Sequence, residues 1–194
     1  MKRPTCLVFL PVFLIVGCNS QQSPSSNGAP AVAADALQSA AKDPGVRAFY
    51  SANAWQAVWS KKAQKALGQA LSQRAVNGLD HVVFLTNAAK QSPEMRDASL
   101  TKAALAYASA LAKGVLDPKG WYKIYAAPRP NPDLATGLRA ALQNGKLDEW
   151  FASLAPQDAE YRSLSLVYRQ MRQATSDKAT DRHAAFPPNT PTCG

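Results

Sequence analysis

Apolar residues recur at helical spacing through the middle of the chain, and this pattern constrains its fold most. The clearest stripe consists of Trp59, Ala63, Ala66, Leu67, Ala70 and Leu71. Its i, i+4, i+7, i+8 spacing lines one face of an amphipathic helix. No segment shows the sustained alternation of apolar and polar residues that a half-buried strand requires. The sequence therefore predicts an all-α fold, a single helical domain of about six helices.

Capping residues divide the pattern into individual helices. Ser60 is a suitable N-cap for the first helix, and Asn77-Gly78 a suitable C-cap. A short second helix is predicted over residues 82–91. Four further stripes follow: residues 100–111 ended by Gly114, residues 134–142 stopped at Asn144-Gly145, residues 147–154 cut off by Pro156, and residues 161–171 capped by Asp158 or Gln157. A Pro-rich connection, residues 126–132, lies between the helices.

The N-terminus has the pattern of a secretory signal. Lys2 and Arg3 precede twelve uncharged residues, 6–17, a run too short to span a bilayer, which takes about 20 apolar residues. The run ends Ile15-Val16-Gly17-Cys18, which resembles the lipobox of bacterial lipoproteins. We therefore expect a signal peptide over residues 1–17 and lipidation, including palmitate, at Cys18. By resemblance to Gram-negative sorting signals, Asn19 favours the outer membrane, with the protein facing the periplasm.

Composition predicts how the rest of the chain is organised. Residues 18–42 hold the lipidated Cys18 and a flexible tether rich in Ser, Gln, Pro, Asn and Ala. The helical domain is expected over residues 43–174. From residue 175 to residue 194 the chain turns polar and then Pro-rich, which predicts a disordered tail.

Charge and cysteine content narrow the possible partners and bonds. Without the signal, 20 Lys and Arg stand against 13 Asp and Glu, so the mature chain is near +7. A basic surface suits anionic partners such as peptidoglycan or lipid headgroups, whereas export separates the protein from nucleic acid, so we expect no nucleic-acid partner. A generally basic proteome explains the charge equally well. Cys193 is the only cysteine left after processing and lipidation, so an intramolecular disulfide is excluded, while an intermolecular one stays open.

The titratable residues do not form a recognisable catalytic or metal-binding pattern. His81 and His183 have no ligand-type residue at i+3 or i+4, so we predict no metal site and no cofactor. His183 and Cys193 lie in the tail, where a nucleophile and its base would lack rigid support. The three glutamates, Glu94, Glu149 and Glu160, lie near helix N-termini, where acids complement the helix dipole. Phosphate-binding loops and nucleophile elbows are also absent.

Aromatic residues are the candidates for glycan or partner contact. Trp55, Trp121, Tyr122 and Tyr125 could stack on sugar rings. Trp59 lies on an apolar helical stripe, so it is expected in the core.

Five short motifs follow one another along the helical region. In chain order they are Phe49-Tyr50 with Trp55; Asn77-Gly78-Leu79-Asp80; Asp97-x-x-Leu100-Thr101-x-Ala103-x-x-x-Tyr107-Ala108; Gly114-Val115-Leu116-Asp117-Pro118; and Leu154-Ala155-Pro156-x-x-x-x-Tyr161-x-x-Leu164. Their order and spacing resemble the helical scaffold domain of the large L,D-transpeptidases of Gram-negative bacteria, enzymes that cross-link peptidoglycan stems. The resemblance covers residues 45–172, and it is chiefly one of fold.

The chain differs from those enzymes at the residues that carry out their catalysis. The nucleophile motif S-x-G-C-x-R, its upstream His and the peptidoglycan-binding module do not occur, and His81 replaces a Pro in the family's turn. We therefore expect a non-catalytic accessory lipoprotein of cell-wall cross-linking that docks on a wall enzyme in trans. A peptidoglycan-binding lipoprotein and a truncated remnant of a transpeptidase remain alternatives.

Overall fold

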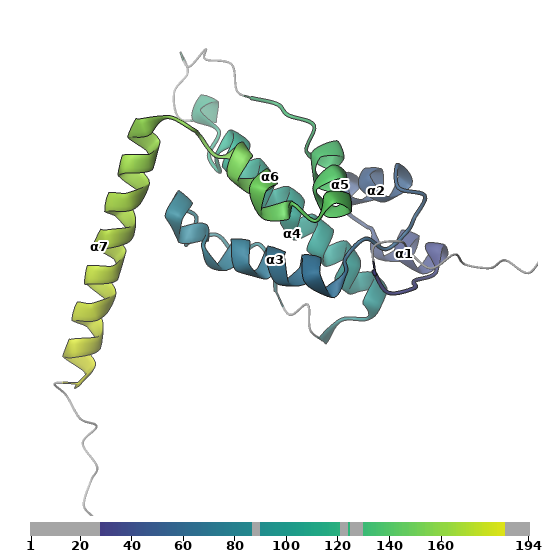
Figure 1. Ribbon diagram of the computed structural model, residues 1–194, viewed down its shortest axis with the longest axis horizontal. Helices are drawn as coiled ribbons and strands as arrows, with labels where there is room; N and C mark the ends of the chain where they lie inside the picture. The colour runs from purple at the N-terminus through teal and green to yellow at the C-terminus, as the bar shows by residue number, and fades with distance from the viewer. Residues whose placement is uncertain (1–27, 87–89, 121–123, 125–129, 185–194) are drawn as a thin grey trace, which may run out of the picture.

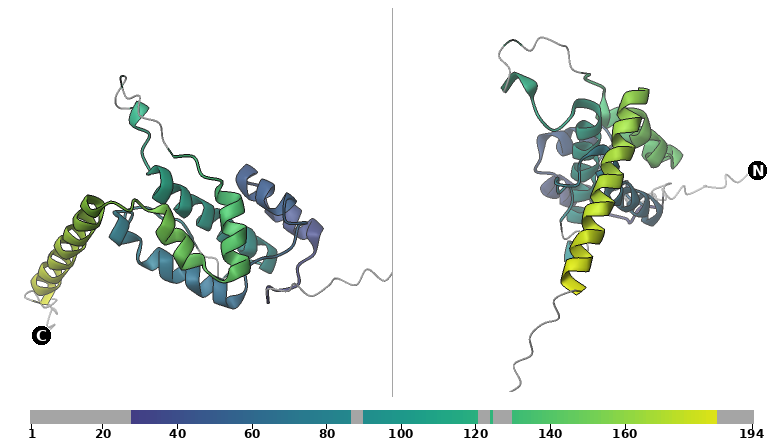
Figure 2. Two further views of the ribbon diagram at one scale, coloured as in Figure 1. Left: turned by 45° about the horizontal axis from the view of Figure 1, so that its top comes forward. Right: turned by 90° about the vertical axis from the view of Figure 1, so that its left-hand side faces the viewer.

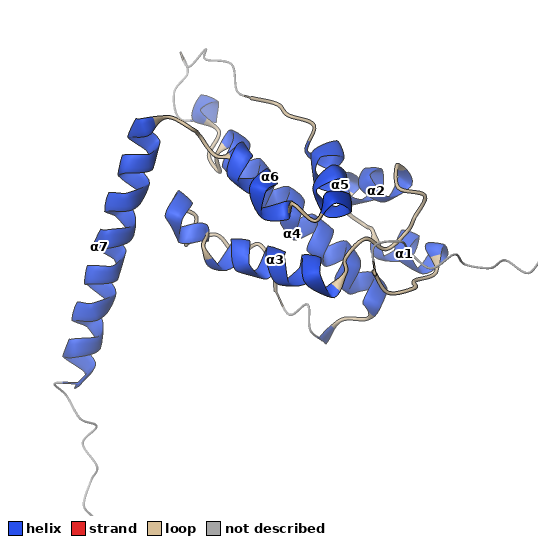
Figure 3. Ribbon diagram, in the orientation of Figure 1, coloured by secondary structure: helices blue, strands red, loops and turns tan. Residues whose placement is uncertain are grey.

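The computed structural model describes residues 28–86, 90–120, 124 and 130–184, with side chains of the last helix described up to Thr175. Within these residues the chain forms seven α-helices and short 3-10 turns, and it contains no strand (Figure 3). The predicted all-α fold is thus confirmed, with seven α-helices in place of about six. The helices are α1 (Ala34–Ala40), α2 (Pro44–Ser51), α3 (Lys61–Ser72), α4 (Pro93–Lys113), α5 (Leu134–Asn144), α6 (Leu147–Leu154) and α7 (Ala159–Ala184), with 3-10 turns η1 (Arg74–Asn77) and η3 (Pro118–Gly120).

Helix α4 is the centre of the domain, and α1, α2, α3, α5 and α6 all pack against it (Figure 1). Its buried face consists of Ala98, Leu100, Ala103, Ala104, Tyr107, Ala108 and Leu111. Four of these side chains are alanines, which let neighbouring helices approach closely while the larger residues fill the space between them. The predicted stripe over residues 100–111 is therefore the core face of the longest helix in the body.

The N-terminal boundary of the domain lies earlier than predicted. Residues 34–42, assigned above to the tether, contain α1, whose Leu37 is fully buried together with the following Ala41. Helix α2 then begins at Asp43, whose carboxylate accepts hydrogen bonds from the N–H groups of Gly45 and Val46. Pro44 occupies the first helical position, where its missing N–H costs no hydrogen bond. The short, Ala-rich α1 has only Leu37 as an apolar signal, which is why periodicity did not reveal it.

The helix predicted over residues 82–91 is wrong for residues 82–86, which form a loop. The loop follows a turn in which the Val82 N–H donates to the Leu79 carbonyl oxygen over 3.1 Å. Val82, Phe84 and Leu85 pack against the core, and the Phe84 ring meets Tyr107 edge-on. Tertiary packing of these side chains outweighs the helical spacing, and the β-branched pair Val82-Val83 adds little helix propensity to oppose it.

A buried polar cluster links α2, the segment before α3, and α4. The Asp97 carboxylate, 2% exposed, accepts hydrogen bonds from the Tyr50 hydroxyl (2.5 Å) and from the backbone N–H groups of Val58 and Trp59 (both 3.2 Å). The Trp59 indole N–H donates to Thr101 Oγ1 (2.9 Å), which lies 2.7 Å from Tyr50 Oη. Since Tyr50 gives its proton to Asp97, the Thr101 hydroxyl donates to Tyr50, and every member is satisfied.

The buried cluster changes the acidity of its members. Burial raises the pKa of Asp97, because desolvation penalises the anion more than the donated hydrogen bonds from Tyr50, Val58 and Trp59 favour it. Burial and the neighbouring Asp97 carboxylate likewise raise the pKa of Tyr50 far above its ordinary value. Trp59 is fully buried, as its apolar stripe predicted.

Helix α7 differs most from the other helices. Asp158 caps it by accepting from the Tyr161 N–H over 2.7 Å, as predicted. Its apolar residues, however, are exposed: Leu164 by 64%, Val167 by 51% and Met171 by 65%. The helix also continues to Ala184, beyond the boundary predicted at residue 174, although Thr, Ser, Asp and His, which are weak helix formers, make up more than half of this stretch. Residues 185–194 lie outside the described part of the chain.

Helices α5 and α6 approach closely at Gly137. A Cβ built on Gly137 would lie 2.6 Å from the Trp150 Nε1 atom, closer than real Cβ contacts allow. Gly68, in the exposed interior of α3, has no atom within 4 Å of such a Cβ and provides a matched comparison.

We predict opposite effects for alanine at these two helical glycines. Gly137→Ala should lower the free energy of unfolding by about 1–2 kcal/mol, because overpacking against Trp150 outweighs the gain in helix propensity. Gly68→Ala should raise it by about 0.5–1 kcal/mol, because only the propensity gain applies. Urea unfolding followed by circular dichroism measures both. Equal effects of the two substitutions would contradict the packing assigned to Gly137.

Candidate interaction site

A cleft of about 710 Å³ opens between α3, η1, α6 and the start of α7. Its volume lies within the range of small-ligand and peptide sites. Buried Tyr107 and Leu111 of α4 and Phe151 of α6 contribute to its floor. The remaining lining residues come from the walls: Gln69, Ala70, Gln73, Val76, Asn77, Asp148, Ala152, Ala155, Pro156, Gln157, Tyr161, Arg162, Ser165 and Leu166.

The rim of the cleft is rich in side-chain amides. Gln69 of α3 and Gln73, the C-cap residue of that helix, lie four residues apart, so both face the same side of the helix, about 6 Å apart along its axis. Gln157, on the opposite wall, donates to the carbonyl oxygens of Ala152 (2.7 Å) and Ala155 (2.6 Å) and so fixes the loop between α6 and α7. The exposed amides on α3 each offer a donor and an acceptor, which suits the peptide groups of a bound chain.

Charges within the cleft balance. Asp148 of α6 and Arg162 of α7 are the charged lining residues, one of each sign. Although the whole chain is basic, the cleft itself offers no net charge to attract an anion. Amides over a small apolar floor, with no net charge, favour an uncharged polar segment such as a protein loop or an extended peptide.

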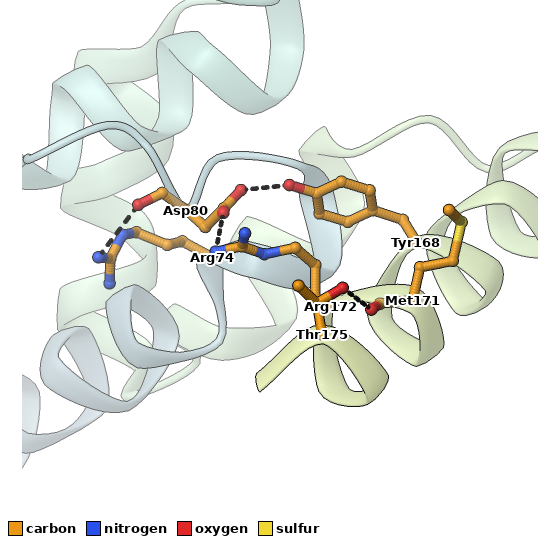
Figure 4. Close-up of polar contacts among 6 residues, drawn as sticks. All are labelled: Arg74, Asp80, Tyr168, Met171, Arg172 and Thr175. Carbon is orange, nitrogen blue, oxygen red and sulfur yellow. Dashed lines mark hydrogen bonds and ion pairs between the residues drawn. The ribbon is translucent and has the colours of Figure 1, made fainter. Parts of the chain in front are cut away.

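Helix α7 forms one wall of the cleft, and hydrogen bonds to the turn after α3 hold it there. The Tyr161 hydroxyl donates to Asn77 Oδ1 over 3.0 Å. About two helical turns later, the Tyr168 hydroxyl donates to Asp80 Oδ1 over 2.6 Å. Arg172 forms a 2.7 Å ion pair with Asp80 Oδ2 (Figure 4). These residues share one side of α7, so they set both the position and the rotation of the helix.

Asp80 is the anchor point of this wall. The Arg74 guanidinium donates to the Asp80 carbonyl oxygen over 3.4 Å (Figure 4). It also donates to the Leu71 carbonyl oxygen over 2.9 Å, so it links the turn to the end of α3. The hydrogen bond from Tyr168, aided by Arg172, lowers the pKa of the Asp80 carboxyl below its ordinary value. Asp80 is therefore ionised at neutral pH, as its contacts require.

Gly78 makes the anchoring turn possible. It has a φ of 68°, in the left-handed region that favours glycine, and it terminates η1. The predicted C-cap at Asn77-Gly78 is confirmed only for η1, because α3 itself ends at Ser72 and Gly78 caps the 3-10 turn that follows. The sequence pattern alone did not identify Asp80, Tyr168 and Arg172 as interacting residues. The i, i+7, i+11 spacing of Tyr161, Tyr168 and Arg172 on a helix was the available signal.

Trp55, proposed as a glycan or partner contact, is engaged within the protein. Its ring stacks on Tyr50, with centroids 6.4 Å apart, and the Arg47 guanidinium lies 5.9 Å from its centroid. Ala54 and Trp55 both have positive φ values, 48° and 54°, and the Trp55 N–H donates to the Tyr50 carbonyl oxygen. The half-buried indole thus closes α2 onto the core. It lies apart from the cleft lining.

The other candidate residues stand as follows. Trp121, Tyr122 and Tyr125 lie outside the described residues, as do the lipidation candidate Cys18 and the tail residue Cys193. The three glutamates lie near helix N-termini as expected: Glu94 in the first turn of α4, Glu149 in that of α6 and Glu160 in that of α7. His81 is exposed beside the Asp80 anchor. Among the described residues no group of His, Cys, Asp or Glu could hold a metal ion.

Comparison with known protein families identifies the domain. The family model described as Scaffold domain matches residues 44–166, well over half of the chain. This chain belongs to the Scaffold domain family. The family match contains α2 to α6 and the first part of α7, so it contains the whole cleft, and α7 extends 18 residues past its end. No curated protein and no solved structure matches the chain significantly.

The scaffold domain explains the short motifs that the sequence analysis singled out. Tyr50, Asp97 and Thr101 form the buried polar cluster, while Asn77 and Tyr161 join α7 to the turn after α3. Leu164 belongs to the same motif as Tyr161 but is exposed. Among the described residues no helix is long and apolar enough to cross a membrane.

Loss of the Asp80 anchor should free α7 from the body. We expect Asp80→Asn to remove the ion pair with Arg172 and weaken the bond from Tyr168, so trypsin cleaves faster after Arg169 and Arg172 than in wild type. The thermal unfolding midpoint of the body should change little, because none of the side chains described for α7, up to Thr175, is fully buried. Limited proteolysis followed by mass spectrometry measures the rate of cleavage at these two sites.

Acid should have the same effect through the same group. Because the folded pKa of Asp80 is lowered, its contribution is fully present above the ordinary carboxyl pKa and is lost as pH falls through the folded value. An acid-stable protease such as pepsin should therefore release α7 at a higher pH from Asp80→Asn than from wild type. Asp148→Asn, an exposed acid on α6, is the control and should behave as wild type. Identical release from all three proteins would refute the anchor.

Proposed function

We propose that this protein is a non-catalytic accessory lipoprotein of peptidoglycan cross-linking, which docks a cell-wall enzyme through the cleft between α3, η1, α6 and α7. In this proposal Cys18 carries the lipid, and the protein is anchored in the outer membrane facing the periplasm. The resemblance to the scaffold domain of L,D-transpeptidases supports the process, and the missing nucleophile motif supports a role other than catalysis.

One observation carries the proposal: the cleft is built from the same motifs that resemble the transpeptidase scaffold. Asn77, Tyr107, Ala155, Pro156 and Tyr161 all line it, and they come from three separate motifs of the sequence. Two of them, Asn77 and Tyr161, hydrogen-bond to each other across 84 positions of sequence. A surface assembled from family-like residues is where a component of the same enzymatic process would be recognised.

The chemistry of the cleft favours a protein segment as occupant. Gln69 and Gln73 lie about 6 Å apart along α3, close to the two-residue repeat of an extended peptide, about 6.6–6.8 Å. An extended segment could therefore pair one peptide group with each amide. The balanced charges of Asp148 and Arg162 demand no strongly charged partner.

The proposed anchor would keep the domain close to the membrane. From Asn19 to α1 the chain has about 15 residues, which as a flexible tether span roughly 20–23 Å on average and at most about 50 Å. The domain would therefore stay within the reach of this tether from the outer membrane. Such confinement raises the effective concentration of a wall enzyme that works in the same layer.

Affinity purification from envelope extracts tests the proposal. The wild-type lipoprotein should recover a cell-wall enzyme, and Gln69→Ala/Gln73→Ala should reduce recovery by about tenfold, the value expected for losing two hydrogen bonds of about 0.7 kcal/mol each. The matched control is Gln38→Ala/Gln56→Ala, which removes two exposed glutamines remote from the cleft. Recovery that is equal for both double variants, or no enrichment of a wall enzyme, contradicts docking through the cleft.

Sedimentation with purified, enzyme-free sacculi tests the alternative of direct glycan binding. We expect the lipoprotein to stay in the supernatant at physiological salt. Co-sedimentation that disappears in Gln69→Ala/Gln73→Ala would identify the cleft as a glycan site and overturn the docking proposal.

A further inference from the structure

Helix α7 carries an apolar stripe that neither the cleft nor the body uses. Leu164, Val167 and Met171 are each at least half exposed, and exposed Ala174 continues their line. Their i, i+3, i+7, i+10 spacing is the a/d repeat by which two helices pack along a seam. An isolated helix in water needs tertiary packing of such a face to be stable.

The contacts of α7 with the body leave this stripe accessible. Tyr161, Tyr168 and Arg172 face the turn after α3, and at about 100° per residue the stripe lies roughly a quarter-turn away from them. The C-terminal part of α7 extends away from the other helices in Figure 1 and in the left view of Figure 2. The projecting part leaves room for a second helix to lie alongside.

We propose that this stripe joins two copies of the chain, with their α7 helices antiparallel about a two-fold axis near Arg169. In this register Leu164 lies opposite Ala174 of the other copy, and Val167 opposite Met171. Each layer therefore pairs a larger with a smaller or more flexible side chain, as close interdigitation requires. The stripe is self-complementary, the property that a two-fold interface needs.

Charges along the helix select the same partner and register. The two positions that extend the stripe are Glu160 and Lys178, and the antiparallel register places Glu160 of one copy opposite Lys178 of the other, at both ends of the seam. The positions flanking the seam between them are Tyr161, Ser163, Tyr168, Gln170, Thr175 and Asp177, of which only Asp177 is charged, and it is next to Lys178 in sequence. Arg162, which lines the cleft, and Arg169 lie on the side of α7 opposite the stripe, so these basic residues do not oppose each other across the seam.

The extent of the stripe sets the strength of the dimer. Four apolar layers bury less than the roughly 1,200 Å² of a standard interface, so we expect a weak dimer with a dissociation constant on the order of 10–100 µM. Lipid anchoring of both copies in one membrane, as in the proposed function, would strengthen the association by confinement. The dimer itself does not depend on that function, because it uses a different face of α7.

Charge reversal tests the proposal most sharply. Sedimentation equilibrium of the full chain in mild detergent with reductant, which prevents disulfides through Cys193, should show a monomer–dimer equilibrium. Glu160→Lys should weaken the dimer by about tenfold, because two like-charged pairs replace two opposite ones. Glu160→Lys/Lys178→Glu should restore it, which a parallel pairing or an unspecific apolar contact would not do.

A second pair of variants separates the stripe from the rest of α7. Leu164→Asp should abolish the dimer, whereas Leu166→Asp, the same change two residues away on a different side of the helix, should leave it intact. Both side chains are more than half exposed, so circular dichroism should show an unchanged fold. A monomer at all concentrations up to about 1 mM, or a dimer insensitive to the charge reversal, would overturn the proposal.

Discussion

The buried carboxylate of Asp97 is the interaction on which the rest of the domain depends. It receives three hydrogen bonds, from the Tyr50 hydroxyl of α2 and from the backbone of Val58 and Trp59 before α3, while itself belonging to α4. Burying a carboxylate is costly, and the raised pKa of Asp97 reflects that cost. The cost is tolerated because no apolar side chain could satisfy two backbone N–H groups in a segment that is not helical. The chain between α2 and α3 is thereby fixed at one place on α4.

Fixing that segment also determines where the cleft lies. Trp59, held by Asp97 and Thr101, immediately precedes the N-cap Ser60, so the start and direction of α3 follow from the buried cluster. Two turns along α4 from Thr101, Tyr107 meets Phe84 and Phe151 edge-on and reaches the cleft floor. The same helix therefore carries the polar cluster at one end and the interaction cleft at the other. Residues within the Scaffold domain match contribute to both the polar cluster and the cleft.

The sequence predicted much of the body because its helices are defined locally. Ser60, Asp158, Gly78 and Gly145 act as caps through backbone geometry that a residue type reveals. The sequence pattern did not predict α1, because the stability of this helix depends on a single side chain, Leu37, packing against α4. The segment at Phe84 was predicted as a helix from the spacing of its apolar residues, but it forms a loop because packing on Tyr107 outweighs that spacing. The cleft and the exposure of Leu164 depend on where α7 lies, and the bonds that place it join residues 84 and 88 positions apart.

Hydrogen exchange of the Val58 and Trp59 amides measures the organising role of Asp97 directly. Both lie in a non-helical segment, where amides ordinarily exchange fast, but both donate to the buried carboxylate. They should exchange only with global unfolding in the wild-type protein, as slowly as the core amides of α4, and at least about a hundredfold faster in Asp97→Ala at the same overall stability. Fast exchange of either amide in the wild-type protein would contradict the account.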